Sequence, residues 1–237
     1  MIQQGIRLLE NGDIHAARQV FTQLLKAEQN IDLALRYLGI SFQNESNFLE
    51  ALSYFNQLIK FTPNDPNAWN AVGTCYSNLL QLQEATDCFK RAIKLSPKTA
   101  ISYSNLGFVL YQKGEYGEAN KAIKKALNID SGLAIAWNNL GHCATAMNHF
   151  SAASDYYKRA LKIEPQITDA LSGLIYANRS VCNWKKIDQY ETLLINQSEK
   201  RIKNGLKTHI TPFMSIFLNI SNVQQQQILK KAILSLW

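Results

Sequence analysis

The chain has 237 residues, of which 46% are hydrophobic and 18% are charged, and this composition is typical of a folded protein rather than a disordered tail. The formal charge of +7 leaves nucleic acid or an anionic membrane surface open as partners. No stretch approaches the roughly 18–20 consecutive apolar residues that span a bilayer. The N-terminus has no basic region followed by an apolar core, so we expect no secretory signal and a cytoplasmic location.

Residue types with catalytic or metal-binding chemistry do not form a recognisable motif. The four histidines lack an HExxH spacing, and the chain has no GxSxG elbow and no glycine-rich phosphate loop. The four cysteines lack the CxxC spacing of metal ligands, and we expect all of them to be buried, reduced thiols that pack as small apolar side chains. They are Cys75, Cys88, Cys143 and Cys182. The sequence therefore predicts a chain without catalytic activity of its own, without a metal and without a cofactor.

Glycine recurs with a period of 34 residues through most of the chain, at Gly5, Gly39, Gly73, Gly107 and Gly141. Alanine follows each glycine at a constant spacing, and a large side chain follows each alanine four residues later. These residues are Ala17, Ala51, Ala85, Ala119 and Ala153, and Phe21, Phe55, Phe89, Ile123 and Tyr157. A repeat of this length predicts a stack of similar supersecondary units.

The clearest unit contains a full set of signature residues, which are Trp69, Val72, Gly73, Tyr76, Ala85, Phe89, Ala92 and Pro97. In spacing and residue type it resembles the tetratricopeptide repeat, or TPR, a pair of antiparallel helices. The resemblance implies an all-α fold, a TPR superhelix (an α-α solenoid) of five to six helix-turn-helix repeats with a C-terminal connector helix. Because the small and aromatic signature residues pack helix against helix, we assign them to the core and none of them to a site.

Three regions are expected along the chain. Residues 1–165 form five TPR repeats, the first of which is truncated. Residues 166–203 form a degenerate sixth repeat and a long helix, with Ile175 in the place of the glycine. Residues 204–237 form a Pro-Phe connector and a terminal amphipathic helix, whose apolar face predicts a partner or a place on the stack.

The first helix of each repeat is expected to line a concave groove that binds an extended polypeptide. The candidate groove residues are Arg36, Asn70, Asn105, Tyr111, Asn138, Asn139 and His142. An asparagine amide both donates and accepts, so a row of asparagines is suited to the backbone of a bound peptide. The alternative is that asparagine occupies an ordinary wet helix face. Only Arg36 is a cation, which disfavours the clamp that other TPR proteins place around a C-terminal carboxylate.

Basic pairs recur on the second helices, at Lys90-Arg91, Lys124-Lys125 and Lys158-Arg159. We interpret them as a solvated convex face. The alternative is a surface that binds RNA or an anionic membrane. Nucleic acid is disfavoured because the aromatic side chains that would stack on bases are assigned to the core.

The segments after the repeats resemble the TPR-containing O-linked N-acetylglucosamine transferases and their bacterial relatives. The matching segments are Cys182-Asn183-Trp184, a long helix after it, and Thr211-Pro212-Phe213. The Asn-Leu-Gly triplets at 105–107 and 139–141 match the asparagine row of that family, although Tyr37 and Ala71 interrupt it. The resemblance implies the substrate-recognition arm of a glycosyltransferase whose catalytic domain is absent from this sequence.

We therefore predict a non-catalytic TPR module that binds protein or peptide, in its most specific form the recognition arm of an O-GlcNAc transferase-like glycosyltransferase. The alternative is part of an active enzyme whose catalytic domain lies outside this sequence and contacts the terminal helix. The second alternative is the RNA or membrane surface described above. A homodimer stays open.

Overall fold

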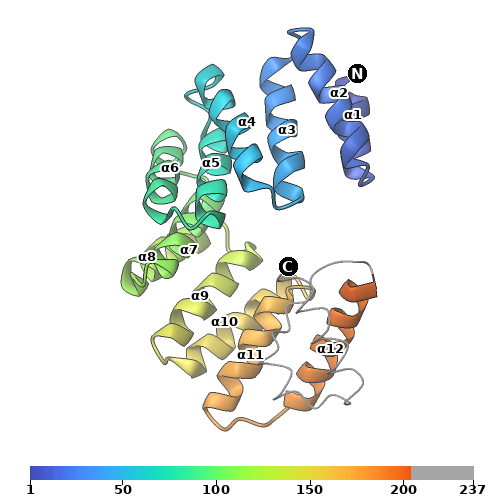
Figure 1. The fold of residues 1–237 in the computed structure, drawn as a ribbon. Helices are drawn as coiled ribbons and strands as arrows, with labels where there is room; N and C mark the ends of the chain where they lie inside the picture. Colours follow the sequence, from blue (N-terminus) through green and yellow to red (C-terminus); the bar gives the residue numbers. More distant parts are fainter. Residues whose placement is uncertain (204–237) are drawn as a thin grey trace. The chain divides into compact units, whose positions relative to one another are not determined.

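A computed structural model describes residues 1–203, and within that range every regular element is an α-helix (Figure 1). The all-α prediction of a solenoid of helical repeats is confirmed, whereas the predicted connector and terminal helix lie outside the described residues. The helices are α1 (Ile2–Glu10), α2 (Ile14–Lys26), α3 (Ile31–Asn44), α4 (Phe48–Phe61), α5 (Pro66–Asn78), α6 (Leu82–Leu95), α7 (Ala100–Gln112), α8 (Tyr116–Ile129), α9 (Ala134–Ala146), α10 (Phe150–Ile163), α11 (Thr168–Ser180) and α12 (Ile187–Lys203).

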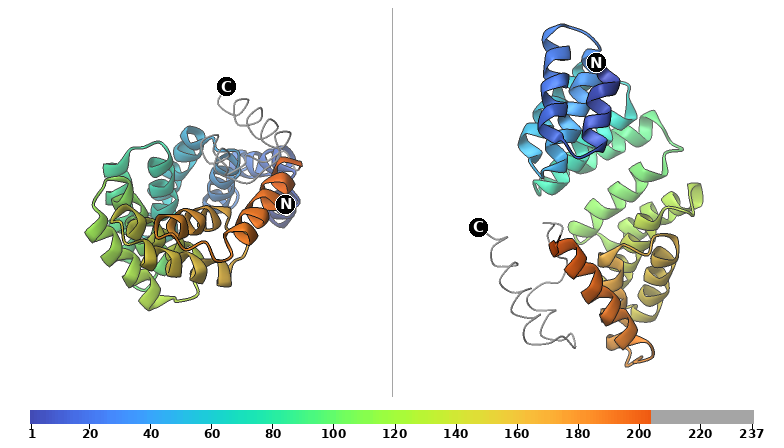
Figure 2. Two further views of the ribbon diagram at one scale, coloured as in Figure 1. Left: turned by 90° about the horizontal axis from the view of Figure 1, so that it is seen from below. Right: turned by 90° about the vertical axis from the view of Figure 1, so that its right-hand side faces the viewer.

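The described helices fall into two compact units, the first of residues 1–129 and the second beginning at residue 130. In the first unit, each helix from α1 to α8 packs against the next. In the second, α10 packs against α9 and α11, and α11 packs against α12. Within each unit the helix pairs follow one another in chain order (Figure 2). The expected region boundaries at 165/166 and 203/204 stay predictions.

Local sequence explains where the helices begin. Pro66 occupies the first turn of α5, where its missing N–H costs no hydrogen bond, and the Asp65 carboxylate accepts from the Asn67 N–H at 2.9 Å. Asp13 caps α2 in a similar way by accepting from the Ala16 N–H. A proline and a capping aspartate thus define the start of α5, and a capping aspartate defines the start of α2.

The turn inside each repeat uses a backbone conformation with positive φ. It recurs every 34 residues, and its members are Gly12, Ser46, Leu80, Gly114, Asn148 and Cys182. Glycine adopts this left-handed region without strain, whereas the other four residue types carry a Cβ penalty there. The recurrence at Cys182 places the same turn between α11 and α12 that joins the helices of the five earlier pairs.

The periodic glycines let the two helices of a pair approach closely. A Cβ on Gly39 would lie 2.4 Å from the Phe55 ring, and one on Gly73 would lie 2.8 Å from the Phe89 ring. These large side chains are almost completely buried, as is the alanine that precedes each of them. The signature residues therefore form the core between the helices.

In the sixth pair, a glycine allows close packing against the preceding pair rather than within the pair. Ile175, which stands at the periodic position, is buried. Gly173, two residues earlier, lies against the Tyr157 ring of the preceding pair, where an added Cβ would be 2.4 Å from Cζ. A strict period of 34 therefore misses the residue that allows α11 to approach α10.

Candidate functional site

The predicted groove residues lie on the first helices of four pairs. Arg36 is on α3, Asn70 is on α5, and Asn105 and Tyr111 are on α7. Asn138, Asn139 and His142 follow on α9. The first four therefore belong to the unit of residues 1–129 and the last three to the unit of residues 130–237.

In the first unit, two of these side chains join neighbouring first helices. Arg36 forms a half-buried ion pair with Asp65, the residue that caps α5. Asn70 is 8% exposed, and its Nδ2 donates to Ser102 Oγ of α7 at 2.7 Å. A similar link joins Ser77 Oγ to a side-chain oxygen of α7. Arg36 and Asn70 thus have a structural role, and the Arg36 charge is compensated within the chain.

The α7 helix presents a more accessible face. Asn105 and Tyr111 are half-buried, and Phe108 between them is 36% exposed. The Phe108 and Tyr111 rings stack with centroids 6.4 Å apart, and Tyr116 of α8 extends the aromatic cluster at 5.8 Å from Tyr111. An amide and two aromatic rings therefore lie together on one helix face.

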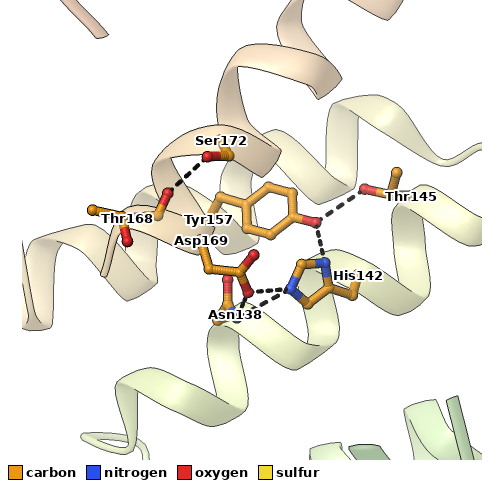
Figure 3. Close-up of polar contacts among 7 residues, drawn as sticks. All are labelled: Asn138, His142, Thr145, Tyr157, Thr168, Asp169 and Ser172. Carbon is orange, nitrogen blue, oxygen red and sulfur yellow. Dashed lines mark hydrogen bonds and ion pairs between the residues drawn. The ribbon is translucent and has the colours of Figure 1, made fainter. Parts of the chain in front are cut away.

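In the second unit, His142 lies at the centre of a hydrogen-bonded network of α9, α10 and α11 (Figure 3). Asp169 Oδ2 lies 2.7 Å from His142 Nε2, and an ionised carboxylate only accepts, so Nε2 carries a proton and donates. In the neutral imidazole Nδ1 is then the acceptor, and it receives the Tyr157 hydroxyl at 3.0 Å. The Thr145 hydroxyl lies 3.2 Å from the Tyr157 oxygen and completes the chain as a donor.

The hydroxyls at the end of this network allow it to persist when His142 is protonated. Both imidazole nitrogens then donate, so Nδ1 donates to the Tyr157 oxygen and the Tyr157 hydroxyl turns to donate to Thr145. No contact has to break.

The order Asp169–His142–Tyr157 resembles the acid, base and hydroxyl of a hydrolase triad, but its geometry opposes that role. The hydroxyl belongs to Tyr157, whose side chain is 1% exposed and packs against Gly141 and Gly173. A nucleophile has to reach its substrate, and this one is enclosed. The network therefore orients His142 and joins three helices.

The two asparagines of α9 are buried, with Asn138 2% and Asn139 5% exposed. Asn138 Nδ2 donates to the same Asp169 oxygen at 2.9 Å. Asn138 Nδ2 also lies 3.1 Å from His142 Nε2. Both nitrogens carry a hydrogen in the assigned tautomer, so this contact is not a hydrogen bond. The half-buried members of the predicted set are thus Arg36, Asn105, Tyr111 and His142, whereas Asn70, Asn138 and Asn139 are buried.

Sequence reasoning did not identify Asp169 or Ser102, because both precede the periodic signature positions of their repeats. Each is a polar residue in the first turn of a first helix, 32 residues after Asn70 for Ser102 and 31 residues after Asn138 for Asp169.

The cysteine prediction is wrong at one position. Cys75, Cys88 and Cys143 are buried, and this burial raises the pKa of Cys75 to about 12 and those of Cys88 and Cys143 to about 11. Cys182 is exposed, because it occupies the positive-φ turn before α12. Within residues 1–203, no group of histidine, cysteine and acidic side chains is arranged to hold a metal ion.

The fold and the packed glycine–aromatic positions define a helical-repeat scaffold. Models of the tetratricopeptide repeat match residues 2–75, 81–114 and 98–166. The chain therefore belongs to the TPR proteins, whose stacked repeats bind protein partners and are in general non-catalytic. No curated protein matches the sequence significantly.

Solved structures share this fold. A structure titled as a functional characterisation of PilF from Pseudomonas aeruginosa has a TM-score of 0.69 and 17% identity, and the match covers 97% of this chain and 95% of that one. The Cut9–Hcn1 structure of the APC/C has a TM-score of 0.77 and 17% identity, with 86% of this chain and 41% of that one covered. MamA has a TM-score of 0.56 and 20% identity, with 74% and 96% covered. At these identities the likeness concerns the fold alone.

Within residues 1–203, no helix combines the length and the apolarity that crossing a bilayer requires.

Proposed function

We propose that the chain binds an extended segment of a partner protein along the exposed faces of its first helices. The observation that carries the proposal is the face of α7, where Asn105, Phe108 and Tyr111 are all partly accessible. A polar amide beside stacked rings is suited to a peptide, because the amide pairs with a backbone group and the rings cover an apolar side chain.

The bound segment is expected to be recognised mainly through its backbone and through aromatic contacts. Arg36 on α3 already forms an ion pair with Asp65, so its charge is not available to bind a terminal carboxylate of the ligand. The contribution of the buried Asn70, Asn138 and Asn139 would be to hold the first helices in register.

The test uses an array of synthetic 15-residue peptides and the peptide that binds most tightly in it. Asn105→Ala and Phe108→Ala should each lower the affinity for that peptide about tenfold, as expected when a contact at the centre of an interface is truncated. Leu49→Ala is the matched control, because Leu49 is 66% exposed but lies on the second helix α4. Unchanged affinity in both α7 variants would refute the proposal.

A narrower form of the proposal is that this module is the recognition arm of an O-linked glycosyltransferase. Its support is the resemblance of Cys182-Asn183-Trp184 and of the long helix α12 to that family. The Pro-Phe segment and the terminal helix, through which a catalytic domain would attach, lie outside the described residues. Reading the gene beyond the codon for Trp237 decides this form: continuation into a nucleotide-sugar-binding fold supports it, and an immediate stop codon opposes it.

The cytoplasmic location and the homodimer remain predictions with separate tests. Fractionation of the native cells addresses the first, and the molar mass in solution addresses the second.

A further inference from the structure

A hollow of about 330 Å³ opens between α6 and α8, with α7 as its floor. This volume is at the lower end of the range for ligand pockets, roughly 300–1,000 Å³. The hollow is lined by the second helices of two repeats and lies within residues 1–129, away from the Asn105–Phe108–Tyr111 face. The three helices are neighbours in Figure 1.

The floor is apolar and the walls are charged. Tyr103, Leu106 and Leu110 follow one another along one face of α7, and Ala122 faces them from α8. Tyr103 is almost buried because Lys125 lies over its ring, with Nζ 4.6 Å from the centroid. Leu106 and Ala122 are half-buried and supply the accessible apolar surface.

Charge is distributed unevenly along the hollow. At the N-terminal end of α8, Glu115 pairs with Lys113 and Glu118 pairs with Lys121, each at 2.8 Å. Lys125, one turn after Lys121 on α8, and Lys90 of α6 also line the hollow, and neither has a salt bridge to any residue that the structure describes. Glu118 and Lys125 are seven residues apart on one helix, which is about 10 Å. The acidic side chains of the hollow are therefore paired with cations, whereas Lys90 and Lys125 have no ion-pair partner among the described residues.

We propose that this hollow docks a short segment of a partner protein in which an apolar residue is followed by acidic residues. The apolar side chain lies over Leu106 and Ala122, and the carboxylates lie between Lys90 and Lys125. This surface is independent of the first-helix face, so the failure of either proposal leaves the other intact.

A polypeptide fits these features better than a nucleic acid or a membrane. A nucleic acid repeats its negative charge at every residue and would place phosphates beside Glu115 and Glu118. It would also find no open ring for base stacking, because Lys125 covers Tyr103. An acidic segment with one apolar anchor needs positive charge only at one end.

The test measures fluorescence anisotropy with a labelled decapeptide of serine and glycine around a central Leu-Phe-Glu-Glu. Two further peptides replace the glutamates with lysines or the Leu-Phe pair with alanines. The full chain is expected to bind the first peptide about tenfold more tightly than either of the others, because both the charge pairs and the apolar anchor contribute. The absence of any such preference would overturn the proposal.

Two double variants with the same change in net charge locate the site. The Lys90→Glu, Lys125→Glu variant is expected to bind the first peptide with about tenfold lower affinity. The Lys94→Glu, Lys124→Glu variant changes the same helices outside the hollow, and its affinity should change by less than about threefold. Equal losses would mean general charge attraction and would contradict the proposal. The milder Lys90→Gln, Lys125→Gln variant removes the two charges without introducing repulsion. It should also bind the first peptide more weakly than the unchanged chain does, which would show that the loss does not come from misfolding.

Labelled oligouridine and vesicles with anionic lipid serve as alternative ligands. If either binds with the same dependence on Lys90 and Lys125 while the peptide does not bind, the hollow belongs to that class of ligand and the proposal is wrong.

Discussion

Gly73 lies in the middle of α5, where glycine costs about 0.5–1 kcal/mol relative to alanine. Its presence is explained by Phe89, since a Cβ at position 73 would lie 2.8 Å from the ring. Gly73→Ala is therefore expected to lower the free energy of unfolding by about 1–3 kcal/mol, the usual cost of overpacking a core. Urea denaturation measures the change.

Gly117→Ala is the matched control for this prediction. Gly117 is in the first turn of α8, and nothing lies within 4 Å of an added Cβ. The helix propensity of alanine should then stabilise the protein by about 0.5–1 kcal/mol. Equal effects at both positions would mean that close helix packing does not explain the periodic glycines.

Tyr157 is the second position where a single group can be tested. Tyr157→Phe keeps the ring, which phenylalanine supplies at the equivalent positions 21, 55 and 89, and removes the hydroxyl between His142 and Thr145. A loss of about 1 kcal/mol in the free energy of unfolding is expected for one buried hydrogen-bonded group. Tyr156→Phe, next to it and half-buried, should change stability by less than about 0.5 kcal/mol. No difference between the two variants would refute the assigned network.

At the scale of the helices, the sequence was informative about the repeat and poor about the contacts between repeats. The glycine, alanine and aromatic positions predicted the helix pairs, because each of them packs inside one pair at a fixed spacing. The links from Asn70 to Ser102 and from Asn138 to Asp169 join different repeats. The period does not reveal which side chains meet across that boundary, so buried asparagines were grouped with the accessible groove residues.

The turns between paired helices test another consequence of the repeat. Leu80 has φ 59°, is 73% exposed and occupies the place that glycine holds at positions 12 and 114. Leu80→Gly is expected to raise the free energy of unfolding by about 0.5–1 kcal/mol, because the left-handed conformation is strained for a residue with a Cβ. Gln81→Gly, one residue later at φ −85°, should lower it by a few tenths of a kcal/mol, because glycine there relieves no strain and adds backbone freedom to the unfolded chain. A loss at position 80 would contradict the conformation assigned to this turn.

At the scale of the molecule, the cysteines report how well the helices are packed. One thiol per chain, that of Cys182, is expected to react rapidly with Ellman's reagent at pH 8, and all four should react in denaturant, because the other three are buried with raised pKa values. Rapid reaction of two or more thiols in the native state would contradict the described core.

The same thiols couple stability to pH. The unfolded chain releases its thiol protons near pH 9.0, whereas Cys75 in the folded state keeps its proton to about 12. The unfolded state therefore binds fewer protons between these values, and this contribution to stability is present below pH 9 and lost as the pH rises toward 12.

The central claim is that the first-helix face around Phe108 on α7 holds an extended segment of a partner protein. The most direct measurement is photo-crosslinking of arrayed 15-residue peptides to benzoylphenylalanine placed at Phe108 on α7, compared with the same group at Lys124 on α8. The best-binding peptide of the array should crosslink at position 108, and position 124 should give only background. Equal yields at both positions, or capture at position 124 alone, would contradict it.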